Sequence, residues 1–161
     1  MLQRKHLILL SLAGAIISFD QLIKTVVVNR FHLGESKEII PNFFNITLVH
    51  NPGAAWGMLA TLDPAIREPF FAIVPLITLA IILFVFQRLH SEQKLSIFAL
   101  SAIVGGAIGN LIDRARIGYV IDFLDFHYRT YHFPAFNLAD SAITLGVFVL
   151  LLTSFFEKQQ N

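Results

Sequence analysis

Four stretches of mostly apolar residues divide the 161-residue chain, and each is close in length to a membrane-spanning helix. A helix needs about 20 apolar residues to cross the roughly 30 Å hydrocarbon core of a bilayer. The first stretch is interrupted by Asp20, Gln21 and Lys24, and the last carries Asp140 near its start. We expect an α-helical membrane protein with four transmembrane helices, which span about residues 7–28, 70–86, 95–112 and 138–156.

The connection between the first two spans has a pattern typical of β-structure. Residues 39–49 are rich in Ile, Phe, Thr and Val, and Asn51-Pro52-Gly53 has the composition of a turn. This β-rich connection, about residues 30–68, predicts a small β-sheet or hairpin on the membrane surface. Gly53 and the two alanines after it would let a ligand approach the backbone closely.

No repeat or low-complexity linker divides the chain, so we expect residues 1–161 to form a single membrane domain. The first apolar segment has some features of a cleaved signal peptide, because Arg4 and Lys5 precede thirteen uncharged residues. Its apolar character resumes after Lys24, however, and three more spans follow, which favours a retained helix.

Composition supports a membrane protein and excludes several kinds of chemistry. Hydrophobic residues make up 55% of the chain and charged residues 14%, whereas a soluble domain has about 25% charged residues. The net charge is +1 with no basic tract, so we expect no nucleic-acid partner. The chain has no cysteine, which excludes disulfides, thiolate metal sites and a thiol nucleophile.

Four spans place both ends of the chain on one side of the membrane. The short segments on that side hold five basic residues, and six others are spread over the two longer connections. The five are Arg4, Lys5, Arg88, Lys94 and Lys158. Because basic residues are enriched in short cytoplasmic segments, we expect the termini to be cytoplasmic.

Polar side chains gather at the opposite end of the predicted bundle. An ionisable group inside a membrane span is energetically costly, so each one suggests a function. Asp20 and Lys24 are four residues apart on one helix face and can neutralise each other. The order of the spans brings further polar residues to the same leaflet, whichever way the protein is oriented. The set is Asp20, Lys24, Asn110, Asp113, Arg114, Asp122 and Asp140.

Motifs that the sequence lacks narrow the chemistry of this cluster. None of the six histidines occurs in a His-Glu-x-x-His pattern, and Gly-x-Ser-x-Gly is absent, as are glycine motifs for nucleotides. Gly105 and Gly109 follow a helical pattern, and their spacing favours close helix packing. Carboxylates remain as the candidate catalytic groups.

Asp122 and Asp140 form the best candidate pair. Two carboxyl groups held close together cannot both ionise easily, so one keeps its proton near neutral pH. The ionised group can take a proton from water while the other donates to a carbonyl oxygen. Asn137, three residues before Asp140, predicts a helix N-cap with an acid at the third helical position. The apolar and aromatic residues around Asp122 favour its neutral form.

Each acidic residue also has an ordinary structural interpretation. Asp140 alone is typical of a helix cap, and Asp122 of an interfacial turn. Asp125 is expected to be a solvated neighbour. Asp113 with Arg114 is typical of a charge pair at the membrane surface that ends a span.

Five sequence blocks carry a resemblance to a known family. They are Asp20-x-x-x-Lys24, Asn51-Pro-Gly-Ala-Ala-Trp-Gly57, Gly105-Gly-Ala-Ile-Gly-Asn-Leu-Ile-Asp-Arg114, Val120-Ile-Asp-Phe123 and Phe136-Asn-Leu-Ala-Asp140. In this order, and over most of the chain, they resemble the bacterial lipoprotein signal peptidases, signal peptidase II. One departure is Trp56, where the family usually has Phe.

The resemblance implies an inner-membrane aspartyl endopeptidase with four helices and a small periplasmic sheet. Such enzymes remove the signal peptide from diacylglyceryl-modified prolipoproteins by cutting just before the lipidated cysteine. Asp122 and Asp140 would be the catalytic dyad near the periplasmic leaflet, in contact with membrane lipids and without a metal or organic cofactor. Substrate-binding or supporting roles would fall to Asn51, Gly53, Asn110, Arg114, Asn137, Asp20 and Lys24.

Two functions of other classes remain as alternatives. A small transporter or channel subunit would use the polar cluster as an ion or proton relay, which requires acidic groups staggered through the bilayer. The predicted spans are uncharged toward the termini. A non-catalytic assembly factor would use the cluster to bind a partner, and Asp→Asn changes at Asp122 and Asp140 would leave that binding largely intact.

Overall fold

A computed structural model describes residues 3–53, 59 and 61–157 of the chain. Ala54, Ala55, Trp56 and Gly57 of the Asn51–Gly57 block lie outside the described residues, as does Lys158.

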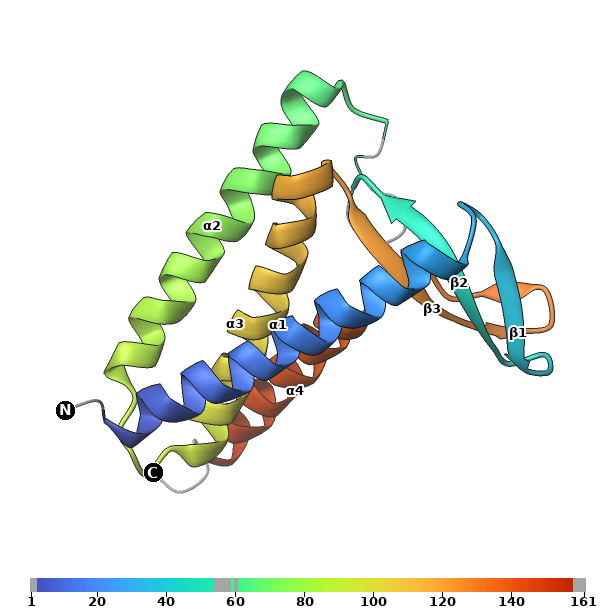
Figure 1. The fold of residues 1–161 in the computed structure, drawn as a ribbon. Coiled ribbons are helices and arrows are strands. Elements are labelled where there is room, and N and C mark those ends of the chain that lie inside the picture. Colours follow the sequence, from blue (N-terminus) through green and yellow to red (C-terminus); the bar gives the residue numbers. More distant parts are fainter. Residues whose placement is uncertain (1–2, 54–58, 60, 158–161) are drawn as a thin grey trace.

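Within the described residues, four helices form the body of the molecule, as the hydrophobic pattern predicts. They are α1 (Arg4–Arg30), α2 (Pro64–Arg88), α3 (Lys94–Ile117) and α4 (Leu138–Glu157). Each of these helices is long and apolar enough to cross a membrane, which confirms the expected multi-pass architecture. The start of α1, the end of α4 and the turn between α2 and α3 lie at one end of the bundle, and the sheet lies at the other (Figure 1).

The helices extend beyond the apolar segments seen in the sequence. α2 begins at Pro64, where the carboxylate of Asp63 accepts a hydrogen bond from the backbone N–H of Ala65 (2.8 Å). Pro75 therefore lies well inside the helix. α3 continues to Ile117, past the expected end at residue 112, and stops at Gly118, whose φ of 81° suits glycine.

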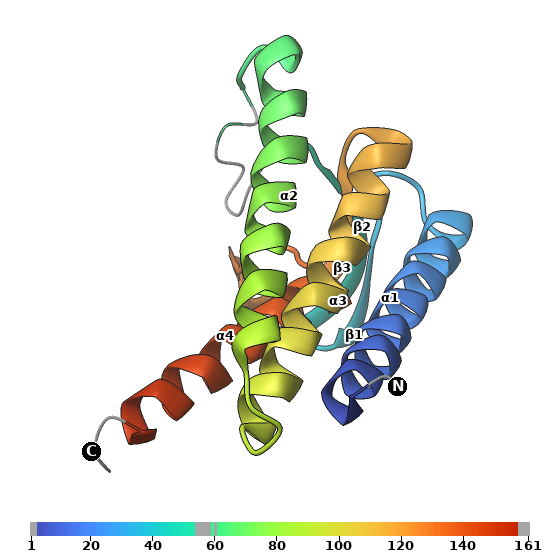
Figure 2. The ribbon, with the colours of Figure 1, turned by 90° about the vertical axis from the view of Figure 1, so that its left-hand side faces the viewer.

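α3 is the central helix and packs against the other three (Figure 2). A Cβ atom at Gly106 would overlap the backbone oxygen of Ala139 in α4. A Cβ atom at Gly105 would lie only 3.0 Å from the Cα of Ala13 in α1. The close helix packing expected from the Gly105–Gly109 spacing is therefore confirmed, and it places the start of α4 directly against α3.

The sheet has the strand order β1-β2-β3-β4, with every neighbouring pair antiparallel. Its strands are β1 (Ser36–Ile40), β2 (Phe44–Asn51), β3 (Val120–Tyr128) and β4 (Tyr131–His132). Only the first two come from the predicted β-rich connection. The interfacial turn considered for Asp122 is wrong, because Asp122 pairs with Val49 inside the sheet.

Alternation along β3 gives the strand two different faces. Ile121 and Phe123 are buried against Val27 of α1 and Leu48 of β2 in a small apolar core. The end of α1 is therefore packed against the sheet, and Asp122 points away from this core on the other face of the strand.

Candidate active site

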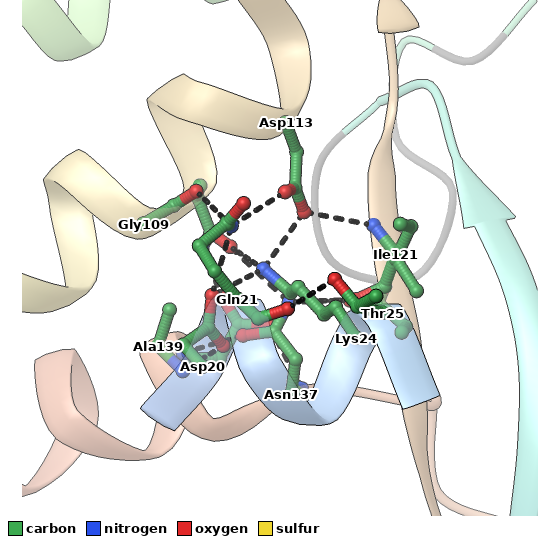
Figure 3. Close-up of polar contacts among 12 residues, drawn as sticks. Asp20, Gln21, Lys24, Thr25, Gly109, Asp113, Ile121, Asn137 and Ala139 are labelled. Atoms are coloured by element: carbon green, nitrogen blue, oxygen red, sulfur yellow. Dashed lines mark hydrogen bonds and ion pairs between the residues drawn. The ribbon is translucent and has the colours of Figure 1, made fainter. Parts of the chain in front are cut away.

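Lys24 lies at the centre of a buried ion cluster between α1 and α3 (Figure 3). Its Nζ atom is 2.7 Å from a carboxylate oxygen of Asp20 and 2.7 Å from one of Asp113. All three residues are at most 3% exposed. The predicted Asp20–Lys24 pair is confirmed. The predicted surface pair of Asp113 with Arg114 is wrong, because the packing of α1 on α3 brings Lys24 to Asp113 instead.

Hydrogen bonds from neighbouring elements complete this cluster. The amide of Gln21 donates to Asp113 Oδ1 (2.8 Å), and the backbone N–H of Ile121 donates to Asp113 Oδ2 (3.2 Å). The backbone N–H of Ala139 donates to Asp20 Oδ1 (3.0 Å). The cluster thereby fixes β3 and the start of α4 relative to α1 and α3. Gln21 had no role assigned from sequence, and its place beside Asp20 within a span was the only signal.

Asn110 connects the ion cluster to Asp140. Its Oδ1 atom accepts hydrogen bonds from Lys24 Nζ (3.1 Å) and from the amide of Asn137 (3.2 Å). With that oxygen facing two donors, the orientation of the amide is determined, and Nδ2 donates to Asp140 Oδ1 (2.7 Å).

Asn137 contacts both members of the candidate pair. Its Oδ1 atom accepts from the backbone N–H of Asp140 (2.9 Å), and its own N–H donates to Asp140 Oδ2 (3.2 Å), which is a capping box. The amide Nδ2 donates to Asp122 Oδ1 (2.8 Å). The predicted N-cap is therefore confirmed, and the same buried side chain holds Asp122 beside the start of α4.

Asn51, at the end of β2, holds the other oxygen of Asp122. Its Nδ2 atom donates to Asp122 Oδ2 (2.9 Å), while its Oδ1 accepts from the N–H of Gly53 (3.0 Å). Arg114 donates to the carbonyl oxygen of Gly53 (3.2 Å), and its guanidinium lies 5.2 Å from the centre of the Phe71 ring. Arg114 thus connects α3 to the segment that positions Asn51.

Asp122 is buried and its pKa is raised to about 7. Burial is the main cause, because it penalises the charged form, and the charge of Asp140 adds to it. Hydrogen bonds from Asn51 and Asn137 and the charge of Lys24 act in the opposite direction. The neutral form expected for Asp122 from its apolar setting is therefore favoured up to neutral pH.

Both carboxyl groups border a cavity of about 920 Å³ that runs from the sheet along α4. The walls are mostly apolar and include Val49, Val120, Phe133, Phe136, Ile143 and Leu145. The predicted site residues on the walls are Asn51, Gly53, Asn110, Arg114, Asp122 and Asp140. Asp20, Lys24 and Asn137 are buried behind them. The structure thus brings the predicted residues together in two layers, one lining the cavity and one supporting it.

Asp125 is not the solvated neighbour that the sequence predicts. It is only 8% exposed, it accepts a hydrogen bond from Asn45 (2.9 Å), and it lies 2.8 Å from a ring nitrogen of His132. Strand alternation places it on the opposite face of β3 from Asp122, away from the cavity.

Comparisons with known proteins agree on one family. A family model described as signal peptidase (SPase) II matches residues 12–156. A lipoprotein signal peptidase of Syntrophotalea carbinolica is 46% identical over 145 residues, which cover 90% of this chain and 89% of the relative. One from Syntrophus aciditrophicus is 44% identical over 98% of both chains. A solved bacterial membrane enzyme superposes with a TM-score of 0.85 at 34% identity, covering 95% of this chain and 90% of that one.

Proposed function

The chain belongs to the signal peptidase II family, and we propose that it removes signal peptides from lipoprotein precursors through a catalytic dyad of Asp122 and Asp140. It is a multi-pass membrane peptidase, and nothing among its relatives supports a transporter or channel. We infer that its substrate class is the lipoprotein precursor, because a lipoprotein signal peptidase is 44% identical to it over nearly the full length of both chains.

The contact of one residue, Asn137, with both carboxyl groups carries the assignment of the dyad. Asn137 donates to Asp122 through its amide and to Asp140 through its backbone, so the two carboxyls are held side by side at the wall of one cavity. Neither forms a salt bridge with a cation among the residues that the structure describes. Carboxyl groups that are oriented by amides and form no direct salt bridge in the described part of the chain are suited to exchanging protons.

In the proposed reaction the pair holds one proton near neutral pH. A water molecule attacks the carbonyl carbon of the scissile peptide and gives a proton to Asp140, while Asp122 donates its proton to the carbonyl oxygen. When the C–N bond breaks, the leaving amine takes the proton from Asp140, and a hydroxyl of the tetrahedral intermediate returns one to Asp122. Water is consumed, the dyad is regenerated, and these steps use no metal or organic cofactor.

The neighbouring residues would keep this geometry in place. Asn51 and Asn110 each fix one carboxyl, and Arg114 holds the Gly53 segment against the cavity. The Nε atom of Arg114 is buried without a hydrogen-bond partner in the described part of the chain. We propose that it donates to a backbone carbonyl of the bound precursor, with Gly53 allowing the extended peptide to approach.

The apolar walls of the cavity suit the acyl chains of a diacylglyceryl-modified substrate, which would enter from the surrounding lipids and be cut just before its lipidated cysteine. We propose that the chain lies in the bacterial inner membrane with cytoplasmic termini, so that the sheet and the dyad lie near the periplasmic leaflet. Because the chain has no cysteine, single cysteines at Ser36 and Ser91 can test this orientation. A membrane-impermeant maleimide added to intact spheroplasts should label position 36 and not position 91, and the reverse pattern would contradict the orientation.

The dyad is tested by cleavage of a diacylglyceryl-modified precursor by the purified chain in lipid. Asp122→Asn and Asp140→Asn should each reduce cleavage by at least about 10³-fold, near the upper range for acid–base groups, and still bind the precursor. Asp63→Asn is the matched control, because Asn caps a helix as well as Asp does and the residue lies at the start of α2. Near-parental cleavage by either folded dyad variant would show that the dyad is wrong.

A further inference from the structure

A second group of chemically active side chains lies on the face of the sheet opposite the dyad. Asp125 and His127 are two residues apart on β3 and therefore share a face. His132 of β4 pairs directly with His127 across the hairpin. The group lies outside the cavity that Asp122 and Asp140 border, and the proposed peptidase reaction makes no use of it.

The three side chains are close enough to converge on one ion. One potential ligand atom from each lies within 4.8 Å of the others. The carboxylate oxygens of Asp125 are 2.8 and 3.0 Å from His132 Nδ1, and the two imidazole rings stack with their centres 4.8 Å apart. His127 Nδ1 is shielded from solvent and has no hydrogen-bond partner among the residues described. A shielded polar atom without a partner is costly, and a bound cation would satisfy it.

We propose that Asp125, His127 and His132 form a binding site for a divalent transition-metal ion such as Zn²⁺. Imidazole nitrogens and a carboxylate oxygen are ligands that Zn²⁺ commonly takes, and three protein ligands leave a fourth position for water. Neighbouring ligands around a tetrahedral Zn²⁺ lie about 3.4 Å apart, so the group must contract slightly on binding. The exposed His132, on an edge strand of two residues, can make that movement.

The surroundings of Asp125 support this interpretation. Asn45 donates to Asp125 Oδ2 (2.9 Å), which leaves Oδ1 for the ion. Hydrogen bonds of this kind orient metal ligands and raise metal affinity.

A metal ion at this position would cross-link the two strands of the β3–β4 hairpin. The chain continues from β4 into Phe133 and Phe136, which form part of the cavity wall. Phe136 also exchanges backbone hydrogen bonds with Leu124 of β3 (2.8 and 3.1 Å). The ion would therefore stiffen one wall of the substrate cavity without touching the reacting groups. This role is accessory, and the site does not depend on the assignment of the dyad.

The test is a titration of the purified, metal-stripped full chain with Zn²⁺ against a fluorescent chelator. We expect saturable binding of one ion per chain, which His127→Gln and His132→Gln each weaken by at least tenfold. His90→Gln is the matched control, because His90 is exposed in the turn between α2 and α3 at the other end of the bundle. Zn²⁺ should raise the thermal unfolding temperature of the parent and of this control, and not that of the two site variants.

Unfolding scans without metal show whether each variant is folded. If a site variant fails to fold, Co²⁺ added to the parent provides the test, because ligation by two imidazoles and a carboxylate at low coordination number gives intense visible absorption bands. Equal Zn²⁺ affinity in the parent and in a folded site variant would overturn the proposal, as would loss of binding in His90→Gln. A Co²⁺ spectrum of the parent identical to that of the hydrated ion would overturn it too.

Discussion

Two groups of carboxylates share the polar end of this bundle, and their partners differ in kind. Asp20 and Asp113 both bind the ammonium group of Lys24. Asp122 and Asp140 are held by amides of three asparagines instead, without a salt bridge in the part of the chain described. An ammonium group neutralises a buried carboxylate, whereas an amide orients it and leaves its charge in place. The partner, more than the acid itself, separates a structural carboxylate from one that can exchange a proton.

Asn110 is the residue where the two groups meet. Its oxygen faces Lys24 and its amide nitrogen faces Asp140. The ion cluster therefore positions the dyad, although it lies behind the cavity wall. Four predictions test these separate roles of the ion cluster and the dyad, from the largest expected effect to the smallest.

Lys24→Met should have the largest effect on stability, because it leaves Asp20 and Asp113 buried without their cation. Removing one partner of a buried ion pair costs about 3–5 kcal/mol of the free energy of unfolding. The same change removes one of the two donors to the oxygen of Asn110, so precursor cleavage should fall as well. Equilibrium unfolding in mixed micelles measures the first effect.

Two comparison variants sharpen this test. Lys37→Met removes an exposed lysine from β1 and should change the unfolding free energy by less than about 0.5 kcal/mol. Adding Asp20→Asn and Asp113→Asn to Lys24→Met removes the uncompensated charges and should restore much of the lost stability. A loss below about 1 kcal/mol for Lys24→Met would show that the cluster does not hold the helices together.

Gly106→Ala should have an intermediate effect, because the new methyl group would displace the backbone of Ala139 and with it the start of α4. Overpacking of this kind costs about 1–3 kcal/mol. Since Asp140 follows Ala139, the rate of cleavage should also fall. Gly14→Ala on α1 is the control, because nothing lies within 4 Å of its added Cβ, and it should stabilise the helix by up to about 1 kcal/mol. Equal stability of the two variants would contradict the close packing.

A change of pH is a milder perturbation than either substitution, because it alters the protonation of Asp122 and leaves every residue in place. The donor form of Asp122 is lost above its pKa of about 7, so kcat/KM should fall about tenfold per pH unit on the alkaline side. Because burial raises this pKa above its unfolded value, the group's contribution to stability is complete only below the unfolded value. That contribution is lost as the pH rises through about 7. The pH–rate profile and unfolding scans at pH 5.5 and 8.5 measure the two effects.

Asn51→Ala separates the contribution of one amide to this profile. The hydrogen bond from Asn51 lowers the pKa of Asp122, so its removal should shift the alkaline limb to higher pH. Asn45→Ala removes the corresponding amide from Asp125 on the other face of the sheet and should leave the limb in place. If Asn51→Ala does not shift the alkaline limb of the pH–rate profile, a group other than Asp122 is responsible for that limb.

The sequence predicts the local parts of this structure well. The four spans, the Asp20–Lys24 pair and the Asn137 cap depend on spacings of a few residues, so each could be found without tertiary information. The meeting of the polar residues at one end followed from the order of the spans.

The parts that the sequence did not predict depend on contacts between distant segments. β2 and β3 pair across about seventy residues, and no local pattern determines that register. The burial of Asp125 and the choice of Lys24 over Arg114 as the partner of Asp113 both follow from how these elements pack. The role of Gln21 was missed for the same reason, because its side chain donates a hydrogen bond to Asp113 on another helix.

The i, i+4 spacing of Asp20 and Lys24 also bears on how the protein is made. Synthesis starts at the amino terminus, so α1 exists before Asn110 and Asp113 have been translated. Because the two charges lie one turn apart, they can pair within α1 itself. Asp20 therefore has Lys24 as its counter-ion before α3 is synthesised. Asp140 and its cap are synthesised only with α4, which follows α1, α2 and α3 in the chain. The growing chain therefore completes its proposed dyad only after Asp20, Lys24 and Asp113 of the ion cluster have been synthesised.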